Sequence, residues 1–570
     1  MIVLGLNHGE INSSAALYID SEFVAAAPEE RFNRQKRTKV FPEKAIEYCL
    51  SVAGIRLNEC DYIAQAWNPG AGWHKNQNIF NDVRSRREGY FYSLPEQLLG
   101  LNGSREKLKD WVVMSFPDKM LPPVYYIQHH RTHAANAFFL SEFEEAAILT
   151  ADFRGEFETA SISHGRGNQI KTLAVQKLPH SLGMFYAAFT ELLGYKPDND
   201  EWKVMAISAF DVDDEEYYQL IKNTIRFTDD GFFELDQSYY KGAIVDQPNL
   251  YTSKLSAMLG GRVGRPGEEI DEWFKKVSKA MQRVSENMAV HMLLKTHELT
   301  KCDSVVLGGG FFMNCVFNGK VLEKTPFKKV YISHSPADVG NCFGAALFVA
   351  HCIHNDKRVV RFNSSYTGPE FSDKEVEQAL RRRKIKFEKS ENWETKVAEI
   401  LATGEVVALM HGRMEFGERA LGNRSILADP RQGEMKDKIN SLIKYREAYR
   451  PFAPAAIAEK CHLFFDVHEG YECPYMEKVV QVREEYCKKM PAITHVDGSA
   501  RLQTVSKDQN PSFHKIIDEF GRLTGLPVVT NTSFNINGEP VVLSPDDALN
   551  TFFNSGLEHL FIGKYYVSKK

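Results

Sequence analysis

The sequence predicts an α/β protein of more than one domain, whose strands end at turns suited to a bound nucleotide. Apolar strands at 146–150, 304–307 and 329–333 run into acidic or glycine-rich turns, and helical patterns follow. The chain has 570 residues, whereas a single hydrophobic core stops growing near about 250–300 residues. We therefore expect at least two domains.

The amino-terminal residues predict three strands joined by short polar turns. Apolar runs stand at 2–6, 15–19 and 23–27, the polar stretch 7–14 separates the first two, and Asp20-Ser21 separates the last two. A strand, a turn of small residues and a second strand can aim backbone N–H groups and hydroxyls at a phosphate.

The later strands of the first part end at residues that are candidates for a functional site. A helix of small residues is expected near 342–352, after the third strand. The turns at the strand ends hold, in chain order, Asp152, the triplet Gly308-Gly309-Gly310, and Asp338.

A domain boundary is expected after residue 355. Residues 354–372 carry charges, two serines, a glycine and a proline, and show no clean period. A charged helix is expected at 373–383. We therefore predict a first domain at 1–355, a linker region at 356–383 and a second domain at 384–570.

The composition narrows the class of protein. Hydrophobic residues make up 43% and charged residues 25%, which is ordinary for a globular chain. The net charge of -5 disfavours a nucleic-acid partner. No apolar run is long enough to span a membrane, and the first residues lack a basic leader. The nine scattered cysteines predict buried, reduced thiols, so we expect a cytoplasmic protein.

The last third of the chain gathers arginines, glycines and asparagines. Arginine offers a charged donor fork that suits phosphate, and glycine lets the backbone approach a ligand. The segments are HGRMEFGERALGNRSIL (411–427), NSLIKYREAYRPFAP (440–454), HVDGSARLQTV (495–505) and NTSFNINGEP (531–540). Their cations are Arg413, Arg419, Arg424, Lys444, Arg446, Arg450 and Arg501, and Asn531 opens the last segment. The alternative is a set of surface arginines paired with acids, but these cations stand beside glycines and apolar strand residues.

Histidines at 129 and 133 form a candidate metal pair. Four residues apart, they share a face if the segment is helical, whereas His130 turns to another face and suits packing. Asp152 and Asp338 follow apolar strands, where metal-binding carboxylates often lie in nucleotide clefts. Two imidazoles and two carboxylates would leave open positions for substrate oxygens. The spacing alone also arises by chance.

The loop LGGGFFMNCVFNGK (307–320) is a candidate nucleotide loop. Its glycine triplet allows adenosine or its phosphate to approach closely, and Asn314 or Asn318 can hydrogen-bond the nucleotide. Lys203 is a candidate phosphate partner. The alternative for the glycine loop is a plain tight turn without a ligand, and the alternative for Lys203 is a solvated lysine.

With these segments in order, the sequence resembles the O-carbamoyltransferase family of nodulation-factor and antibiotic biosynthesis. The resemblance covers nearly the whole chain, and its specificity lies in the order of the motifs. The motifs are SSAAL (13–17), EERFNRQKRTKVFP (29–42), QHHRTHAA (128–135), SLGMFY (181–186), NDEWKVMA (199–206), GGGFFMN (308–314), the Asp338 turn, GERALGNRSIL (417–427), YREAYRPFAP (445–454) and NTSFNINGEP (531–540).

The resemblance implies two folds and two reaction steps. The first domain is expected to have the actin- and sugar-kinase-like (ASKHA) fold, and the second to be YrdC-like α/β. Carbamoyl phosphate and ATP, with Mg²⁺, would give carbamoyl adenylate and pyrophosphate in the second domain. A hydroxyl of a small, sugar-like or natural-product acceptor would then take the carbamoyl group in the first domain.

The resemblance also implies residue roles. Carbamoyl phosphate and ATP would be held by Arg419, Arg424, Lys444, Arg450, Arg501 and Asn531, with Arg413 and Arg446 beside them. The adenylate would contact Gly309, Gly310 and Asn314, with Gly308 and Lys203 nearby. One divalent metal, iron in the family and with zinc or manganese left open, would be bound by His129, His133, Asp152 and Asp338. The expected catalytic residues are Arg419, Lys444, Arg450 and His8.

The sequence departs from the family at the expected transfer base. Relatives carry His-Asp before the small-residue run, where this chain has Ile11-Asn12, so His8 is the substitute that the turn offers. Glu418 replaces a proline and His411 a glutamine.

The aromatic segment 67–101 predicts either an acceptor pocket or a packed insertion. A regulatory ATP-binding protein of the actin-like superfamily is the alternative function, and a homodimer stays open.

Overall fold

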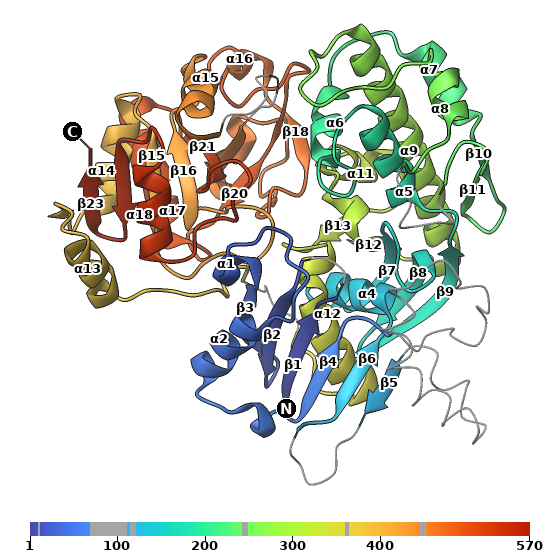
Figure 1. Cartoon of the computed structure of the whole chain (residues 1–570), viewed down its shortest axis with the longest axis horizontal. Helices are drawn as coiled ribbons and strands as arrows, with labels where there is room; N and C mark the ends of the chain where they lie inside the picture. Colours follow the sequence, from blue (N-terminus) through green and yellow to red (C-terminus); the bar gives the residue numbers. More distant parts are fainter. Residues whose placement is uncertain are drawn as a thin grey trace. The chain divides into compact units, whose positions relative to one another are not determined.

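The computed structural model describes residues 1–9, 12–68, 111–114, 121–241, 249–359, 364–444, 449 and 452–569, with 111–114 as backbone only. The chain divides into two compact units. The first comprises Met1–Ala26 and Lys39–Asn363, and the second comprises Ala27–Thr38 and Ser364–Lys570. Both units combine sheets with helices (Figure 1), so the predicted α/β class is confirmed.

The predicted linker region contains the change from one unit to the other. The division falls between residues 363 and 364. The charged helix α13, Asp373–Arg382, agrees with the expected 373–383. Its apolar side chains Val376 and Leu380 belong to a core of the second unit, so the division places α13 within that unit.

The first unit holds two large sheets with a shared topology. The first sheet has the order β3-β2-β1-β4-β6-β5 and the second has the order β13-β12-β7-β8-β9. In each, strands that are consecutive in the chain pair antiparallel at one side and the next two strands of the sheet add in parallel; the first sheet then ends with β5, which is antiparallel to β6. This repeated arrangement agrees with the expected actin- and sugar-kinase-like class. The strands are β1 Ile2–Asn7, β2 Ser14–Ile19, β3 Glu22–Pro28, β4 Tyr62–Gln65, β5 Trp111–Met114, β6 Val124–Ile127, β7 Glu145–Ala151, β8 Glu158–Arg166, β9 Gln169–Lys177, β12 Ser304–Gly308 and β13 Lys329–Ile332.

The expected strands of this unit are confirmed, and the turn chemistry explains one of their connections. Asp20 and Ser21 have φ values of 45° and 73°. Positive φ at both central residues is the type I′ geometry that matches the twist of a two-residue hairpin. The pair therefore joins β2 tightly to β3.

Two helices lie between the two sheets and contact each other (Figure 1). Helix α12, Asn341–Leu347, packs on β1, β2 and β4, and helix α4, His129–Phe139, packs on β7, β8 and β12. Close packing of α12 needs small residues, because a Cβ on Gly344 would lie 1.9 Å from the carbonyl oxygen of Thr132 in α4. The small-residue run of the sequence thus brings these two helices together.

The remaining elements of the first unit surround this frame. The long helix α9 is capped by Asp271, whose side chain accepts from the backbone N–H groups of Trp273 and Phe274. The helices are α2 Glu43–Ala53, α5 Leu182–Leu192, α6 Glu201–Ile207, α7 Glu215–Lys222, α8 Ser253–Met258, α9 Glu272–Thr300, α10 Cys315–Asn318 and α11 Val321–Lys324. The short turns and hairpin are η1 Leu57–Glu59, η5 Gly310–Met313, η6 Asp338–Gly340, η7 Phe348–Ile353, β10 Ile225–Phe227 and β11 Phe233–Leu235.

The second unit is built on an eight-stranded mixed sheet. The strand order is β14-β23-β22-β15-β16-β21-β17-β20, and β18 and β19 form a separate two-stranded sheet. The strands are β14 Glu388–Lys389, β15 Val407–Met410, β16 Arg424–Ala428, β17 Ala453–Ile457, β18 Val479–Gln481, β19 Ser499–Arg501, β20 Gln503–Val505, β21 Val528–Ser533, β22 His559–Ile562 and β23 Tyr565–Ser568. The helices and turns are α1 Glu30–Asn33, α14 Trp393–Ala402, α15 Met435–Ile439, η8 Asn440–Lys444, η9 Ala458–Leu463, α16 Glu484–Cys487, α17 Pro511–Thr524 and α18 Pro545–Phe553.

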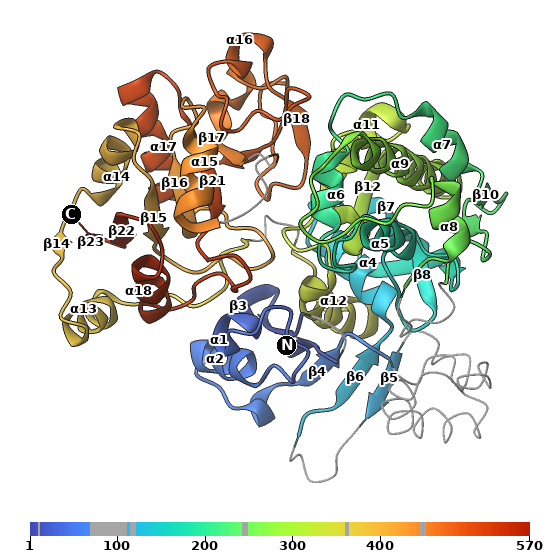
Figure 2. The ribbon, with the colours of Figure 1, turned by 45° about the horizontal axis from the view of Figure 1, so that its top comes forward.

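Alternation along β15 divides the core of the second unit into two layers. Val407 and Leu409 join one buried cluster, and Ala408 and Met410 join another, because successive side chains of a strand point to opposite faces. Helices α14 and α17 lie side by side over the first cluster (Figure 2). Helices α13 and α18 supply side chains to the second.

The structure also bears on the predicted state of the cysteines and on membrane-spanning segments. All nine cysteines are free thiols and seven are buried, as predicted. Among the described residues, no helix combines the length and the apolar character that crossing a bilayer requires.

Candidate functional site

Helix α4 carries the histidine pair. His129 and His133 lie one turn apart on the same face and are fully buried. The carboxylate of Glu156 accepts from the backbone N–H of His129, with both oxygens 3.1 Å from the nitrogen. Burial raises the pKa of Glu156 to about 7, and the N–H groups that the N-terminal turn leaves unpaired favour its charged form.

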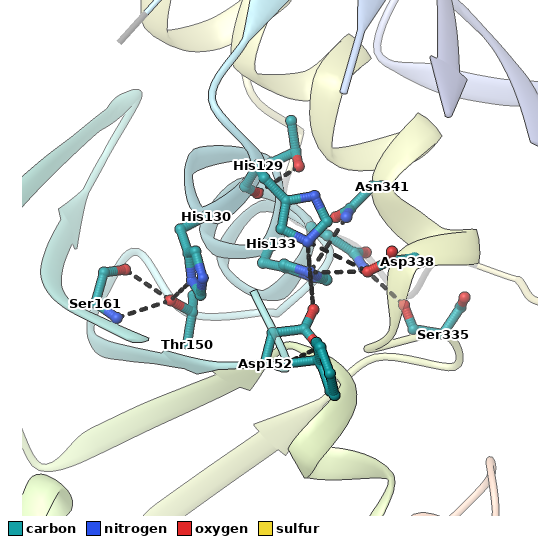
Figure 3. A network of polar contacts seen from close by, with 12 residues as sticks. His129, His130, His133, Thr150, Asp152, Ser161, Ser335, Asp338 and Asn341 are labelled. Carbon is teal, nitrogen blue, oxygen red and sulfur yellow. Dashed lines mark hydrogen bonds and ion pairs between the residues drawn. The ribbon is translucent and has the colours of Figure 1, made fainter. Parts of the chain in front are cut away.

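Two aspartates from different elements meet the histidines (Figure 3). Asp152 directly follows β7, and Asp338 opens the turn η6 before α12. The Nε2 atom of His133 lies 2.7 Å from Asp152 Oδ2 and 3.4 Å from Asp338 Oδ1. The Nε2 atom of His129 lies 3.3 Å from each of these oxygens and 2.9 Å from His133 Nε2. The four predicted ligands therefore lie together.

This donor set fits a divalent metal. Four ligand atoms, two imidazole nitrogens and two carboxylate oxygens, lie within 4.8 Å of one another, and all four residues are buried. If each metal–ligand bond is about 2.1 Å long, two ligand atoms of a tetrahedral site lie about 3.4 Å apart. The distances of 3.3 and 3.4 Å between the histidine nitrogens and the aspartate oxygens are close to this value. Two nitrogens and two oxygens suit iron, zinc or manganese.

The charges of the cluster also favour a cation. Burial alone lowers the pKa of His129, but Asp338 and Asp152 outweigh it and raise this pKa to about 10. Burial and the neighbouring His129 lower the pKa of His133, and the same two aspartates raise it overall. Burial raises the pKa of Asp152, but its hydrogen bonds to the two histidines bring it well below the usual range. The carboxylates thus stabilise positive charge between them.

The third histidine of the motif has a different environment, as expected. His130 Nδ1 lies 2.8 Å from Thr150 Oγ1, which lies 2.7 Å from Ser161 Oγ (Figure 3). Burial and the adjacent histidines lower its pKa well below the usual value. His130 is therefore neutral and ties α4 to the second sheet.

The glycine triplet packs directly against this cluster. A Cβ on Gly308 would lie 2.8 Å from the carbonyl oxygen of His133, and one on Gly310 would lie 2.8 Å from Asp152 Oδ1. Gly309 has a φ of 101°, and its N–H donates to Pro336. Gly308 and Gly309 therefore have no room for a side chain, a side chain at Gly310 would displace the Asp152 carboxylate, and the loop lies beside the four ligands.

The other predicted nucleotide ligands have partners of their own. The Asn314 carboxamide exchanges hydrogen bonds with Gln282 of α9, at 3.0 and 3.3 Å, and caps α10 through Phe317. The ammonium of Lys203 lies 3.3 Å from Asp200 and over the ring of Trp202.

His8 lies at the end of β1. Its ring meets that of Phe41 edge-on at 5.2 Å, and its carbonyl accepts from the Gln65 side chain. Burial lowers its pKa, so the ring is neutral near pH 7 and can accept a proton. Ile11, and the segment 67–101 from residue 69 onward, lie outside the described residues.

In the second unit, a buried glutamate shapes the loop that carries Arg419. Glu415 Oε1 accepts from the backbone N–H groups of Leu421, Asn423 and Arg424, at 2.7, 3.2 and 3.2 Å. Among the described residues, no hydrogen bond or ion pair holds the half-buried guanidinium of Arg419. This cation is therefore available to a ligand.

Two predicted arginines contact backbone carbonyls. Arg424 is fully buried, and its guanidinium donates to the carbonyls of His411, Gly412, Asn423 and Pro369. Arg413 donates to the carbonyls of Thr367 and Gly368, at 2.7 and 3.4 Å. Both side chains hold neighbouring loops together.

Two of the remaining predicted ligands, Asn531 and Lys444, belong to or contact strand β21. The Asn531 amide donates to the carbonyl of Ala420, which follows Arg419, and to Gln503. Lys444 Nζ contacts the carbonyls of Ser533 and Asn535 at the end of the same strand. Arg501 ends β19, immediately before β20. Arg446 and Arg450 lie outside the described residues.

Polar residues that the sequence analysis did not single out also contact these sites. Asn341 lies 3.2 Å from His133 through its side-chain amide, and Glu156 and Glu415 accept from backbone N–H groups as described. Asn341 stands three residues after Asp338. This spacing places two residues on the same face of a helix, and it is the sequence pattern from which Asn341 could have been predicted. The two glutamates have no comparable sequence signal, because their partners are backbone groups.

Comparisons with known proteins match the whole chain. The model of the carbamoyltransferase N-terminus matches residues 3–347, and that of the carbamoyltransferase C-terminus matches residues 398–569. An uncharacterised protein of Synechocystis sp. is 35% identical over 100% of this chain and 96% of its own length. The nodulation protein NolNO of Sinorhizobium fredii is 34% identical over 98% of this chain and 79% of its own length.

More distant matches include a named enzyme and a solved structure. The 3'-hydroxymethylcephem-O-carbamoyltransferase of Amycolatopsis lactamdurans is 28% identical over 77% of this chain and 80% of its own length. Component A of the Acidaminococcus fermentans (R)-2-hydroxyglutaryl-CoA dehydratase is 12% identical, with a TM-score of 0.32, over 61% of this chain and 97% of its own. A TM-score this low says nothing about the chemistry. The two family models, however, cover most of the chain, which therefore belongs to the carbamoyltransferase family and is an enzyme of carbamoyl transfer.

Proposed function

We propose that this protein is an ATP-dependent O-carbamoyltransferase that makes carbamoyl adenylate and passes the carbamoyl group to a hydroxyl of a small molecule. The supporting observation is the buried cluster of two histidines and two aspartates beside a glycine loop, in a chain matched by both carbamoyltransferase models. One relative is named for carbamoylating a hydroxymethyl group of a cephem. The acceptor class follows from that likeness.

The first step needs cations and a well-ordered loop. Atom balance requires that water releases phosphate from carbamoyl phosphate to leave carbamate, whose oxygen attacks the α-phosphorus of ATP as pyrophosphate departs. Charge then develops on phosphoryl oxygens, which guanidinium groups stabilise. The guanidinium of Arg419, which has no hydrogen bond or ion pair with a described residue, suits this role, and Glu415 orders its loop. Lys444, Arg450, Arg501 and Asn531 complete the proposed binding set.

The neighbouring side chains suggest how the binding set is held. Arg424 and Arg413 fix the loops around Arg419 through backbone carbonyls. Lys444 holds the end of β21, where the NTSFN motif turns. We propose that the first two shape the site, while Arg419 contacts the phosphates directly.

The second step uses the first unit. His129, His133, Asp152 and Asp338 would hold one divalent metal, which when bound polarises the carbamoyl oxygen or lowers the pKa of the acceptor hydroxyl. The glycine triplet packs against His133, Ala151 and Asp152, and we propose that its backbone, beside the four ligands, contacts the adenylate. Neutral His8 is the proposed acceptor of the hydroxyl proton.

Pyrophosphate release tests the proposal. The full chain is incubated with ATP and Mg²⁺, with and without carbamoyl phosphate. Release that requires both substrates is expected; release of only phosphate and ADP would instead favour the regulatory ATPase. Arg419→Ala should abolish the release, whereas Arg522→Ala, an exposed arginine of α17 paired with Glu519, should not change it.

Transfer is measured separately with a panel of sugar, nucleoside and aminoglycoside alcohols. His129→Ala is expected to spare pyrophosphate release and to block carbamoyl transfer, while His164→Ala, whose ring pairs with Glu145 instead, serves as control. Equal loss of both activities in His129→Ala would refute the proposed division between the two units.

A further inference from the structure

Asn341 is a buried polar residue directly beside the proposed metal ligands. It is the first residue of α12, three positions after Asp338, and its side chain is fully buried. Figure 3 shows it on the α12 side of the cluster, facing His133. Its position therefore depends on the same turn that places Asp338.

The carboxamide contacts the atom of His133 that also faces the aspartates. Its Nδ2 lies 3.2 Å from His133 Nε2. Its Oδ1 is buried and accepts no hydrogen bond from another described residue. A buried amide oxygen without a donor is costly, so this orientation leaves one polar atom unsatisfied.

A bound metal would reverse the preference for this orientation. The Nε2 atom of a neutral imidazole has a single lone pair, and metal coordination uses it. The Asn341 N–H would then lose its acceptor and would point toward a cation. A half-turn of the carboxamide exchanges the nitrogen and the oxygen, which have nearly the same shape. It places Oδ1 toward the centre, at a separation from His133 Nε2 that lies within the 2.7 to 3.4 Å range of the four-residue cluster.

We propose that Asn341 Oδ1 is a fifth protein ligand of this metal centre, an inference that rests on the metal site of the proposed function. Two imidazoles and three oxygens make a harder donor set than two imidazoles and two carboxylates alone. Such a set favours a five- or six-coordinate ion such as Fe²⁺, Mn²⁺ or Co²⁺ over tetrahedral Zn²⁺. In an octahedral arrangement one position stays open for a substrate oxygen.

The test uses Co²⁺ as a spectroscopic probe of the metal-free full chain. Four-coordinate Co²⁺ absorbs more strongly in the visible range than five- or six-coordinate Co²⁺. The wild-type chain is expected to bind one Co²⁺ with weak absorption. Asn341→Leu should raise the absorption per Co²⁺ and lower the Co²⁺ affinity by at least about ten-fold, and Asn341→Asp, which keeps an oxygen donor, should retain the weak absorption.

A matched control separates ligation from general packing. Asn136 on α4 is also buried and donates to the carbonyl of Ser335, at 2.7 Å, so Asn136→Leu should leave the Co²⁺ spectrum unchanged. If Asn341→Leu does not fold, as judged by circular dichroism, Asn341→Ser takes its place, because serine is too short to reach the metal.

The outcomes distinguish this inference from the proposed function. Wild-type spectrum and affinity in Asn341→Leu or Asn341→Ser would overturn the role of Asn341 and leave the four-ligand centre standing. If the wild-type chain bound no Co²⁺, or if His133→Ala bound it equally well, the metal centre itself would be refuted, and the fifth ligand with it.

Discussion

The ammonium of Lys444 lies 2.5 Å from the carbonyl oxygen of Ser533 and 2.8 Å from Asn535 Oδ1. It is buried, although lysine is one of the residues least often found inside proteins. Its contacts lie where β21 ends and the NTSFN motif turns. Lys444 thus couples the segment 440–444 to the strand that also carries Asn531.

Replacing Lys444 should therefore affect both stability and the first reaction step. Lys444→Met keeps the stem but leaves buried acceptors without their donor, which should cost about 1–3 kcal/mol of unfolding free energy. Pyrophosphate release should fall to background. Lys460→Met, at an exposed ion pair with Asp518, should change neither quantity. Normal release by Lys444→Met would exclude Lys444 from the site.

Glu415 should control the affinity for ATP through the loop that carries Arg419. Glu415→Ala removes an acceptor shared by three buried backbone N–H groups, and Glu415→Gln keeps one neutral acceptor. We expect the KM for ATP to rise about ten-fold or more in the alanine variant and less in the glutamine variant. Co²⁺ binding in the first unit should stay unchanged. Equal KM values in all three proteins would contradict this role.

The glycine triplet offers a test in which two adjacent substitutions differ in effect. Gly309→Ala combines a φ of 101° with a Cβ only 2.2 Å from the carbonyl oxygen of Ala151, which should cost about 3 kcal/mol of stability. In Gly310→Ala the new methyl group meets the Asp152 carboxylate, so metal affinity should fall more than stability. Thermal unfolding and Co²⁺ titration measure the two effects.

Gly54→Ala is the control for backbone strain alone. Gly54 has a φ of 66°, and no heavy atom lies within 4 Å of the position that a Cβ would take there. We expect a loss of about 1 kcal/mol without an effect on metal binding. If Gly309→Ala cost no more than Gly54→Ala, the close packing of the loop would be disproved.

Acid should destabilise the first unit through His334. Burial lowers the pKa of this side chain to about 4, whereas an unfolded histidine titrates near 6.5. Between these values the unfolded chain binds more protons, so stability is present above pH 6.5 and is lost as the pH falls. The loss should reach about 2 kcal/mol at pH 5.

Urea unfolding at pH 5, 6 and 7, followed by a probe in the first unit, measures this effect. His334→Gln should flatten the pH dependence, and the exposed His468→Gln should not. An unchanged slope in His334→Gln would show that other groups cause the acid sensitivity.

The parts of the metal cluster differ in how far the sequence could predict them. The spacing of His129 and His133 fixes a shared helical face, and Asp152 follows an apolar strand, so local patterns were sufficient for both. The orientation of Asn341 toward His133 depends on how α12 packs against α4, which is a tertiary property. The sequence therefore predicted the four proposed ligands but not Asn341.

The cationic segments show the same limit. The sequence placed Arg419 and Arg424 in one glycine-rich segment, with equal claims to bind phosphate. In the structure Arg424 is buried against four carbonyls, whereas Arg419 is half-buried. Burial is decided by residues distant in sequence, among them Pro369, so composition alone could not separate a structural arginine from an available one.

Metal binding should release protons. Burial disfavours the charged form of His129, but Asp338 and Asp152 raise its pKa to about 10, and the pKa of His133 is raised as well. Near pH 7 the metal-free cluster therefore holds at least one proton on these rings, and a metal must displace it, because only the neutral imidazole coordinates. Apparent Co²⁺ affinity should consequently rise with pH between 6 and 8.

Calorimetric titration in buffers of different ionisation enthalpy measures the number of protons released. We expect about one or more per Co²⁺ in the wild-type chain and fewer in His129→Ala. Removing the metal with a chelator should stop carbamoyl transfer and spare pyrophosphate release, because the proposed activation site lies in the second unit. Proton-neutral binding would contradict the charged state of the histidine pair, and loss of pyrophosphate release on chelation, with Mg²⁺ restored, would contradict the separation of the two steps.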